Sequence, residues 1–218
     1  MPRMKLSELN LLDILNSAEY ARILSLFSEE KAKKKEIVFP PNHVDNKVLI
    51  IKKGRMRVYL MLNGKEFTLS ILEPGDVFTT HTRAFTQCLD DCVFLVTSTK
   101  KFQAILLDHP AFAFTIIKVL GDLLHNSITI INGLMFKDVA TRLAEFLVSM
   151  ADHKGVQTEA GIRLKLGLNI EQIAMLVGAS RQTISGVFAD LAKAGLVSKE
   201  EQGAIIILNI EVLRELAS

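Results

Sequence analysis

Residues 168–197 hold two apolar patterns of helical period separated by a glycine, and this segment constrains the fold more than any other. Asn169 and Ser180 are residue types that commonly cap helix starts. Gly178 suits a left-handed helix end. The apolar positions are Ile173, Ala174, Leu176 and Val177, then Ile184, Val187, Phe188 and Leu191. The spacing predicts two short helices joined by a tight turn, a helix-turn-helix.

Polar side chains take the outward positions at the start of the second predicted helix. They are Ser180, Arg181, Gln182 and Ser185. Arg can bind guanine, Gln can bind adenine, and Ser can bind bases or phosphate. A helical hairpin inside a core would show the same periodicity, so the periodicity alone leaves both interpretations open. The outward cluster favours double-stranded DNA as the partner, with these four residues as candidate contacts.

Charge limits how such DNA binding would work. From residue 139 to the end there are eight Lys or Arg residues against nine Asp or Glu residues, so this half is not a basic block. This nearly equal number of basic and acidic residues is compatible with a dimer that binds a specific DNA sequence and contacts a few phosphates. Its non-specific affinity is expected to be modest and sensitive to salt.

The composition is that of a globular chain for one large or two small domains, with 218 residues and 49% hydrophobic residues. The start shows no signal-peptide pattern, and no uninterrupted apolar run has the length of a membrane span. We therefore expect a cytoplasmic protein with no membrane partner and with reduced thiols. Cys88 and Cys92 lack a second Cys/His pair, so ordinary strand or loop cysteines are favoured over a metal site.

The first half of the chain changes from a helical to a strand pattern. Residues 5–27 are predicted to be helical, with apolar positions at Leu9, Leu12, Leu15 and Ile23. Strands are predicted between residues 37 and 96, with β-rich runs at 48–51, 56–60 and 67–72. Asn63-Gly64 between two of these runs predicts a hairpin. The pattern indicates a β-sandwich or roll, preceded by a solvated lysine patch at residues 31–35.

A long helix is predicted from Pro110 to about Gly133. Ile117, Leu124 and Ile131 fall seven residues apart, and Leu120, Ser127 and Leu134 form a companion series. Such a helix either packs entirely within its own domain or also pairs with a second copy. Its apolar residues on more than one face favour a homodimer.

The helix is expected to end at a hinge over residues 132–137. A further helix over 138–152 then leads into strands at 162–166 and 204–208, which would flank the helix-turn-helix as a wing.

An N-terminal antiparallel β-roll of the cyclic-nucleotide-binding kind, a long dimerisation helix and a C-terminal winged helix-turn-helix make an α+β chain. This order resembles the CRP/FNR family of transcription regulators, and residues 178–181, Gly-Ala-Ser-Arg, match its recognition-helix start. Gln182 and Gly186 replace the family's common Glu and second Arg. The resemblance implies a sensory domain over 1–109, a dimerisation helix over 110–135 and a DNA-binding domain over 136–218. It also implies RNA polymerase as a partner, and no enzymatic activity.

The residues of the predicted roll indicate which branch of the family, and therefore which kind of effector, the resemblance implies. Arg83 is present where cyclic-nucleotide sensors have an Arg-Ser pair, but Ala84 lacks the hydroxyl and the ribose-binding glutamate is missing. No cysteine precedes Cys88, which disfavours the iron–sulfur branch.

Residues 75–85, with His81, are most similar to the carbon-monoxide-sensing haem branch of the family, as are residues 120–124, 129–134 and 180–183. The similarity implies haem b as cofactor and CO as effector. It implies His81 and Pro2 as iron ligands, since Met1 is normally removed before a proline and leaves a free amine. It places Leu120, Gly121 and Leu124 over the bound gas. Thr79 stands where some members have a cysteine ligand of the ferric iron, so thiolate ligation is not expected.

Two alternatives remain open at this stage. A family regulator for another small effector would keep the DNA-binding half and make His81 incidental. A metal-dependent β-roll enzyme would need several histidines and a carboxylate inside the roll. Only His81 and His43 are available for that purpose, without a His-x-His pair. The other histidines, His43, His109, His125 and His153, are interpreted as structural.

Overall fold

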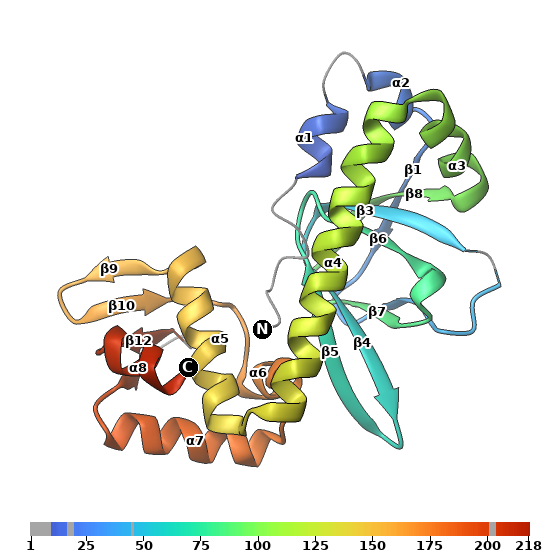
Figure 1. Ribbon diagram of the computed structural model, residues 1–218. Helices are drawn as coiled ribbons and strands as arrows, with labels where there is room; N and C mark the ends of the chain where they lie inside the picture. Colours follow the sequence, from blue (N-terminus) through green and yellow to red (C-terminus); the bar gives the residue numbers. More distant parts are fainter. Residues whose placement is uncertain (1–9, 17–19, 45, 201–203) are drawn as a thin grey trace. The chain divides into compact units, whose positions relative to one another are not determined.

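The computed structural model describes residues 10–16, 20–44, 46–200 and 204–218 (Figure 1). These residues form two compact units, the first extending to Asn126 and the second running from Ser127 to Ser218. Helix α4 (Pro110–Phe136) contributes residues to both units. The α+β fold class is confirmed, with an antiparallel roll, a long helix and a winged helix-turn-helix. The domain limits at 109/110 and 135/136 stay predictions.

Two antiparallel sheets of four strands make up the roll in the described part of the first unit. One sheet has the order β1-β8-β3-β6 and the other β2-β7-β4-β5. The strands are β1 Ser28–Ala32, β2 Ile37–Phe39, β3 Lys47–Lys53, β4 Met56–Leu62, β5 Lys65–Leu72, β6 Val77–Thr79, β7 Phe85–Cys88 and β8 Cys92–Ser98. The three predicted runs are confirmed as β3, β4 and β5. Strand β1 was not predicted, because its sequence Ser-Glu-Glu-Lys-Ala has one apolar residue.

Two apolar cores hold this unit together, and strand β3 contributes to both. Successive residues of a strand point to opposite faces. Leu49 and Ile51 join the core between the two sheets, whereas Val48 and Ile50 join a core formed with the helices. The second core also contains Leu11, Leu15, Ile23, Phe27, Leu95, Phe102, Ile105 and Phe112. Burial on both faces explains the continuous apolar run in β3.

The predicted hairpin at Asn63-Gly64 is confirmed. Leu62 of β4 pairs with Lys65 of β5, which leaves a loop of two residues. Both loop residues have positive φ, 50° for Asn63 and 74° for Gly64. This is the backbone of the primed turns that match the twist of the flanking strands, and Asn-Gly adopts it at low cost.

The prediction of one helix over residues 5–27 is wrong for the residues that the structure describes. Residues 10–27 instead hold two short helices, α1 (Leu11–Leu15) and α2 (Ala21–Leu24), and residues 5–9 lie outside the described part. The Asn10 side chain accepts hydrogen bonds from the backbone N–H groups of Leu12 (3.1 Å) and Asp13 (3.4 Å). A side-chain cap of this kind starts a new helix at this point.

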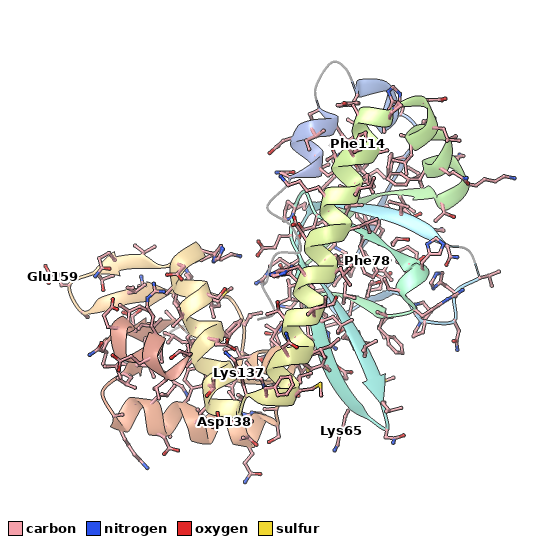
Figure 2. All side chains as sticks on the ribbon, in the orientation of Figure 1. Lys65, Phe78, Phe114, Lys137, Asp138 and Glu159 are labelled. Carbon is pink, nitrogen blue, oxygen red and sulfur yellow. The ribbon has the colours of Figure 1, made fainter. Side chains whose placement is uncertain are left out.

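Helix α4 runs without a break through Asn132-Gly133, so the predicted hinge is too early. The chain leaves helical geometry at Lys137 and Asp138, which Figure 2 labels between α4 and α5. The Asp138 carboxylate accepts a hydrogen bond from the Thr141 N–H (2.8 Å) and begins α5 (Val139–Lys154). A second helix, α3 (Thr99–Asp108), precedes α4 and was not predicted.

By length and composition alone, α4 is apolar enough to cross a membrane, contrary to the expectation from the sequence. The difference arises because Lys118 and Asp122 interrupt the apolar runs without outweighing the apolar residues around them. Length and composition are weak criteria, since the helix of a soluble protein can satisfy both. The expectation of no membrane partner stays a prediction.

In its described part the second unit contains the end of α4, four further helices and a small antiparallel sheet with strand order β11-β12-β10-β9. After α5 the elements are β9 Val156–Thr158, β10 Gly161–Leu164, α6 Ile170–Val177, α7 Arg181–Lys193, β11 Val197–Lys199, β12 Ile205–Ile207 and α8 Ile210–Leu216. Phe146 of α5 and Phe188 of α7 are almost fully buried. The predicted flanking strands are confirmed as β10 and β12.

Candidate functional site

Helices α6 and α7 form the predicted helix-turn-helix, and its three local signals act as expected. Asn169 and Gln172 form a reciprocal capping box at the start of α6. Gly178 ends that helix in the left-handed region with φ of 71°. The Ser180 hydroxyl caps α7 by accepting a hydrogen bond from the Thr183 N–H (3.0 Å). Sequence-encoded caps therefore fix both the turn and the start of the second helix.

Helix α7 presents one apolar and one polar face. Ile184, Phe188 and Leu191 are buried in the second unit. Arg181, Gln182 and Ser185 are exposed on the other side, together with the cap Ser180. The structure thus brings the four predicted DNA-contact residues together on one accessible surface. Their contacts with bases stay predictions.

Arg142 of α5 fixes the position of the turn, a role that the sequence did not reveal. Its guanidinium donates to the carbonyl oxygens of Val177 (2.9 Å) and Gly178 (3.2 Å) at the end of α6. It also donates to the carbonyl of Lys137, where α4 gives way to α5 (2.5 Å). Carbonyls at a helix end lack partners within the helix, so one side chain satisfies the groups that α6 leaves open.

Replacing Arg142 by methionine is expected to destabilise the helix-turn-helix by about 2 kcal/mol, the range of a hydrogen bond to a charged group. The loss follows because three half-buried carbonyls lose their common donor. Hydrogen exchange of the α6 and α7 amides measures it. Arg163→Met is the control, since Arg163 pairs with Glu200 at a largely exposed site and should change exchange little. Equal exchange in the two variants would contradict the role of Arg142.

The second candidate site surrounds His81, in the 3₁₀ turn η1 (Thr80–Thr82) after β6. Thr80 is buried, and its hydroxyl accepts a hydrogen bond from the Lys47 N–H (2.8 Å), which ties the turn to β3. Arg83 ends the turn in the left-handed region, with φ of 56°, and donates to the carbonyls of Pro41 and His43. The turn is therefore anchored on both sides and holds His81 outward.

The His81 ring has a defined hydrogen-bond partner. Its Nδ1 lies 2.8 Å from the Thr79 hydroxyl oxygen. When Nδ1 carries the ring proton, Thr79 accepts that hydrogen bond and Nε2 keeps the lone pair that a metal requires. This orientation of an imidazole by a second residue is typical of metal-ligating histidines.

His81 lies at the edge of an apolar cavity of about 280 Å³, close to the lower end of typical ligand sites. Strands β3 and β6, helices α3 and α4 and the η1 turn enclose it. Its lining residues are Val48, Val77, Phe78, Thr79, His81, Thr82, Thr99, Phe102, Gln103, Leu106, Ile116, Val119, Leu120 and Leu123. Figure 2 labels Phe78, which lies next to α4 in that view. The cavity thus combines an almost entirely apolar lining with one imidazole.

The predicted residues of the gas-binding side divide between two faces of α4. Leu120 lines the cavity. Gly121 and Leu124 are not among its lining residues, and Leu124 is 62% exposed. Ile116, Val119 and Leu123 lie on the cavity face instead, which the sequence analysis did not single out. Pro2 lies outside the described residues.

The exposed face of α4 carries a regular apolar stripe. Ile117, Leu124 and Ile131, the first predicted series, are 61%, 62% and 54% exposed. Phe114, Ile128 and Met135 are exposed as well, and together with Gly121 they continue the stripe at alternating spacings of three and four residues. This spacing is a heptad seam. The predicted companion residues Leu120 and Leu134 are also exposed and flank it.

Two of the histidines interpreted as structural have backbone contacts. The His43 and His153 rings contact the carbonyls of Pro40 (2.8 Å) and Ser149 (2.7 Å). Cys88 and Cys92 are free, buried strand residues, and a hydrogen bond to Cys92 together with burial raises the pKa of the Cys88 thiol. Among the described residues no three His, Cys, Asp or Glu side chains gather as a site for a metal ion.

Comparison with known families divides the chain in the same way. Residues 29–109 match the family described as the cyclic nucleotide-binding domain. Residues 141–216 match the Crp-like helix-turn-helix domain.

Among solved structures, a double variant of CooA from Carboxydothermus hydrogenoformans is 46% identical, with full coverage of both chains and a TM-score of 0.94. The reduced CO-sensing protein from R. rubrum is 28% identical, over 97% of this chain and 100% of that one, with a TM-score of 0.55. A CRP-like cAMP-activated global transcriptional regulator of Mycobacterium tuberculosis is 26% identical over 185 residues, 78% of this chain and 79% of the relative. The mycobacterial relative is thus a transcriptional regulator activated by cAMP, whereas the R. rubrum protein senses CO, so the effectors of these relatives differ.

Proposed function

The chain belongs to the CRP/FNR family of transcription regulators, and we propose that it is a haem-dependent activator that responds to carbon monoxide. In this proposal the first unit binds haem b and the second binds DNA. Two copies form a dimer through α4. The dimer binds a two-fold DNA site in the cytoplasm and contacts RNA polymerase. The likeness to CooA, a CO-dependent transcription factor with a haem domain, supports the haem and CO assignment.

The observation that carries the haem assignment is His81 at the edge of an apolar cavity with its Nδ1 already engaged by Thr79. The free Nε2 is a strong ligand for haem iron, and imidazole remains bound in both oxidation states. Ferrous haem would supply an iron that binds carbon monoxide. The apolar walls would exclude water from the porphyrin faces.

The opposite side of the haem is assigned by resemblance. Pro2 would supply the second ligand through its free amine, a weaker ligand that the gas can displace. Leu120, Gly121 and Leu124 would surround the bound gas. Leu120 already lines the cavity, whereas Gly121 and Leu124 lie on the stripe face, so they would contact a haem only after pairing or rotation of α4.

The geometry around Arg83 disfavours a cyclic nucleotide as the effector. A phosphate site needs a guanidinium that is free to bind it. Here Arg83 donates to the carbonyls of Pro41 (3.3 Å) and His43 (3.0 Å). The next residue, Ala84, is buried and has no hydroxyl to offer.

The test is an absorbance spectrum of purified protein supplied with haem b, before and after reduction and addition of carbon monoxide. We expect a Soret band that shifts with the gas. DNA binding, measured on sequences selected from a random pool, should increase with CO. A protein that acquires no Soret band would overturn the haem proposal and leave the family assignment intact.

Arg181→Ala is expected to remove sequence discrimination in DNA binding. One bidentate contact to guanine contributes about 1–3 kcal/mol of discrimination, and a dimer loses two of them. The measurement is the ratio of dissociation constants for the selected site and for random DNA at fixed salt.

Lys193→Ala is the matched control for this variant, because Lys193 is an exposed basic residue at the other end of the same helix. Its discrimination ratio should stay at the wild-type value. An unchanged ratio for Arg181→Ala would show that α7 does not read bases through this residue.

A further inference from the structure

We propose that Thr79 is the positioning residue for the haem ligand, orienting His81 and setting the strength of its bond to iron. This inference rests on the proposed haem function and deepens it. The observation is the contact of 2.8 Å between the Thr79 hydroxyl and His81 Nδ1.

The backbone of Thr79 is held more firmly than that of an ordinary loop residue. Thr79 is the last residue of β6 and pairs with Val48 of the central strand β3. Its carbonyl accepts a hydrogen bond from the Thr82 hydroxyl (3.4 Å) across the turn. The β-branched side chain has few allowed rotamers, so the hydroxyl is presented in a fixed direction.

The anchor continues into the turn that carries the histidine. Thr80, the residue between Thr79 and His81, is buried and bonded to the Lys47 N–H. The Cα positions of Thr79 and His81 are therefore fixed relative to each other. The hydroxyl and the ring meet without ordering a flexible segment, so the ligand is pre-organised before haem binds.

The chemical consequence concerns the far side of the ring. A threonine hydroxyl can donate or accept a hydrogen bond, so the contact is compatible with either tautomer of the free ring. Once Nε2 binds iron, Nδ1 carries the ring proton, and the Thr79 hydroxyl is placed to accept the hydrogen bond that it donates. The hydrogen bond from Nδ1–H to Thr79 also makes the imidazole a more basic ligand. Thr79 thus acts on the iron through His81 and has no bond to the iron itself.

The experiment compares Thr79→Val, Thr79→Ser and Thr158→Val in the full chain loaded with haem b. Valine keeps the shape and removes the hydroxyl, and serine keeps the hydroxyl. Thr158→Val is the matched control, because it removes a hydroxyl that bonds the Gly161 carbonyl (2.8 Å) in the second unit. The readouts are the rate of haem transfer to an excess of apomyoglobin and the iron–histidine stretching frequency in the Raman spectrum.

We expect Thr79→Val to weaken haem binding about tenfold, the lower end of the effect of removing such a partner, and to lower the stretching frequency. Thr79→Ser should restore both values, and Thr158→Val should leave both unchanged. If Thr79→Val does not fold, the serine variant with a wild-type frequency and Thr79→Ala with a lowered one make the same test. Wild-type frequency and transfer rate in the variants lacking the hydroxyl would overturn this inference alone, whereas a wild-type chain without a Soret band would overturn it together with the haem proposal.

Discussion

His81→Ala is expected to abolish stable haem binding, so that the purified variant supplied with haem b shows no persistent Soret band after gel filtration. The reason is that the described lining of the cavity is otherwise apolar or hydroxyl-bearing, apart from the amide of Gln103. Pro2 alone would be a weak ligand. The measurement is the Soret absorbance per mole of protein, compared with that of the wild type.

Two further variants separate loss of the ligand from loss of structure. His153→Ala removes a histidine of the second unit whose ring contacts the carbonyl of Ser149, and it should retain the full Soret band. His81→Gly leaves room for an added imidazole, which should restore the band. A His81→Ala protein that retains haem like the wild type would refute the ligand assignment.

The parts of the fold that the sequence predicts well are those encoded by neighbouring residues. The helix-turn-helix is the clearest case, because Asn169, Gly178 and Ser180 each act within four residues of their own position. The Asn63-Gly64 hairpin is another. In each case the cap or turn residue and the apolar period predict the same boundary, which makes the prediction accurate.

Contacts between distant segments escaped prediction. Arg142 bonds carbonyls at Val177 and Gly178, and no local pattern indicates a partner that far along the chain. The start of α1 at Leu11 was not predicted, because the helical period of residues 5–27 outweighed the capping role of Asn10. Strand β1 was missed because its burial depends on pairing with β8, which follows about 60 residues later.

In the candidate haem site, too, some residues could be identified from the sequence and others only from the structure. The resemblance of residues 75–85 to the haem branch of the family pointed to His81. The same resemblance presented Thr79 only as the residue that stands in place of a cysteine ligand. The contact depends on the turn geometry of η1, which spacing alone does not specify. The sequence also does not specify which face of α4 lines the cavity. The structure shows that this face carries Ile116 and Val119.

The helical period explains why Leu120 and Leu124 serve different surfaces. Residues 116, 119, 120 and 123 lie on one side of α4 and line the cavity. Residues 117, 121 and 124 lie on the adjacent side and remain exposed. A single chain therefore leaves an apolar seam uncovered, and a second copy of the same seam would cover it. The dimer would also bring Gly121 and Leu124 into a buried environment.

Leu124→Glu is accordingly expected to convert the dimer into a monomer. Leu124 stands in the middle of the seam, and pairing would bury two carboxylates without partners, each costing about 3–5 kcal/mol. Since each 1.4 kcal/mol is a factor of ten, the dimer should weaken by more than about 10⁴-fold. Sedimentation velocity at micromolar concentration measures the change. A monomer reaches one half-site only, so binding to a two-fold DNA site should be lost as well.

The matched control is Leu107→Glu. Leu107 is an exposed leucine of α3, 74% exposed and outside the seam. That variant should sediment as a dimer and keep its DNA affinity, because its carboxylate stays in water. A Leu124→Glu protein with the sedimentation coefficient of the wild type would show that α4 does not pair through this seam. A different partner would then have to bury the exposed stripe. A dimer that binds a two-fold DNA site would have to form through another interface.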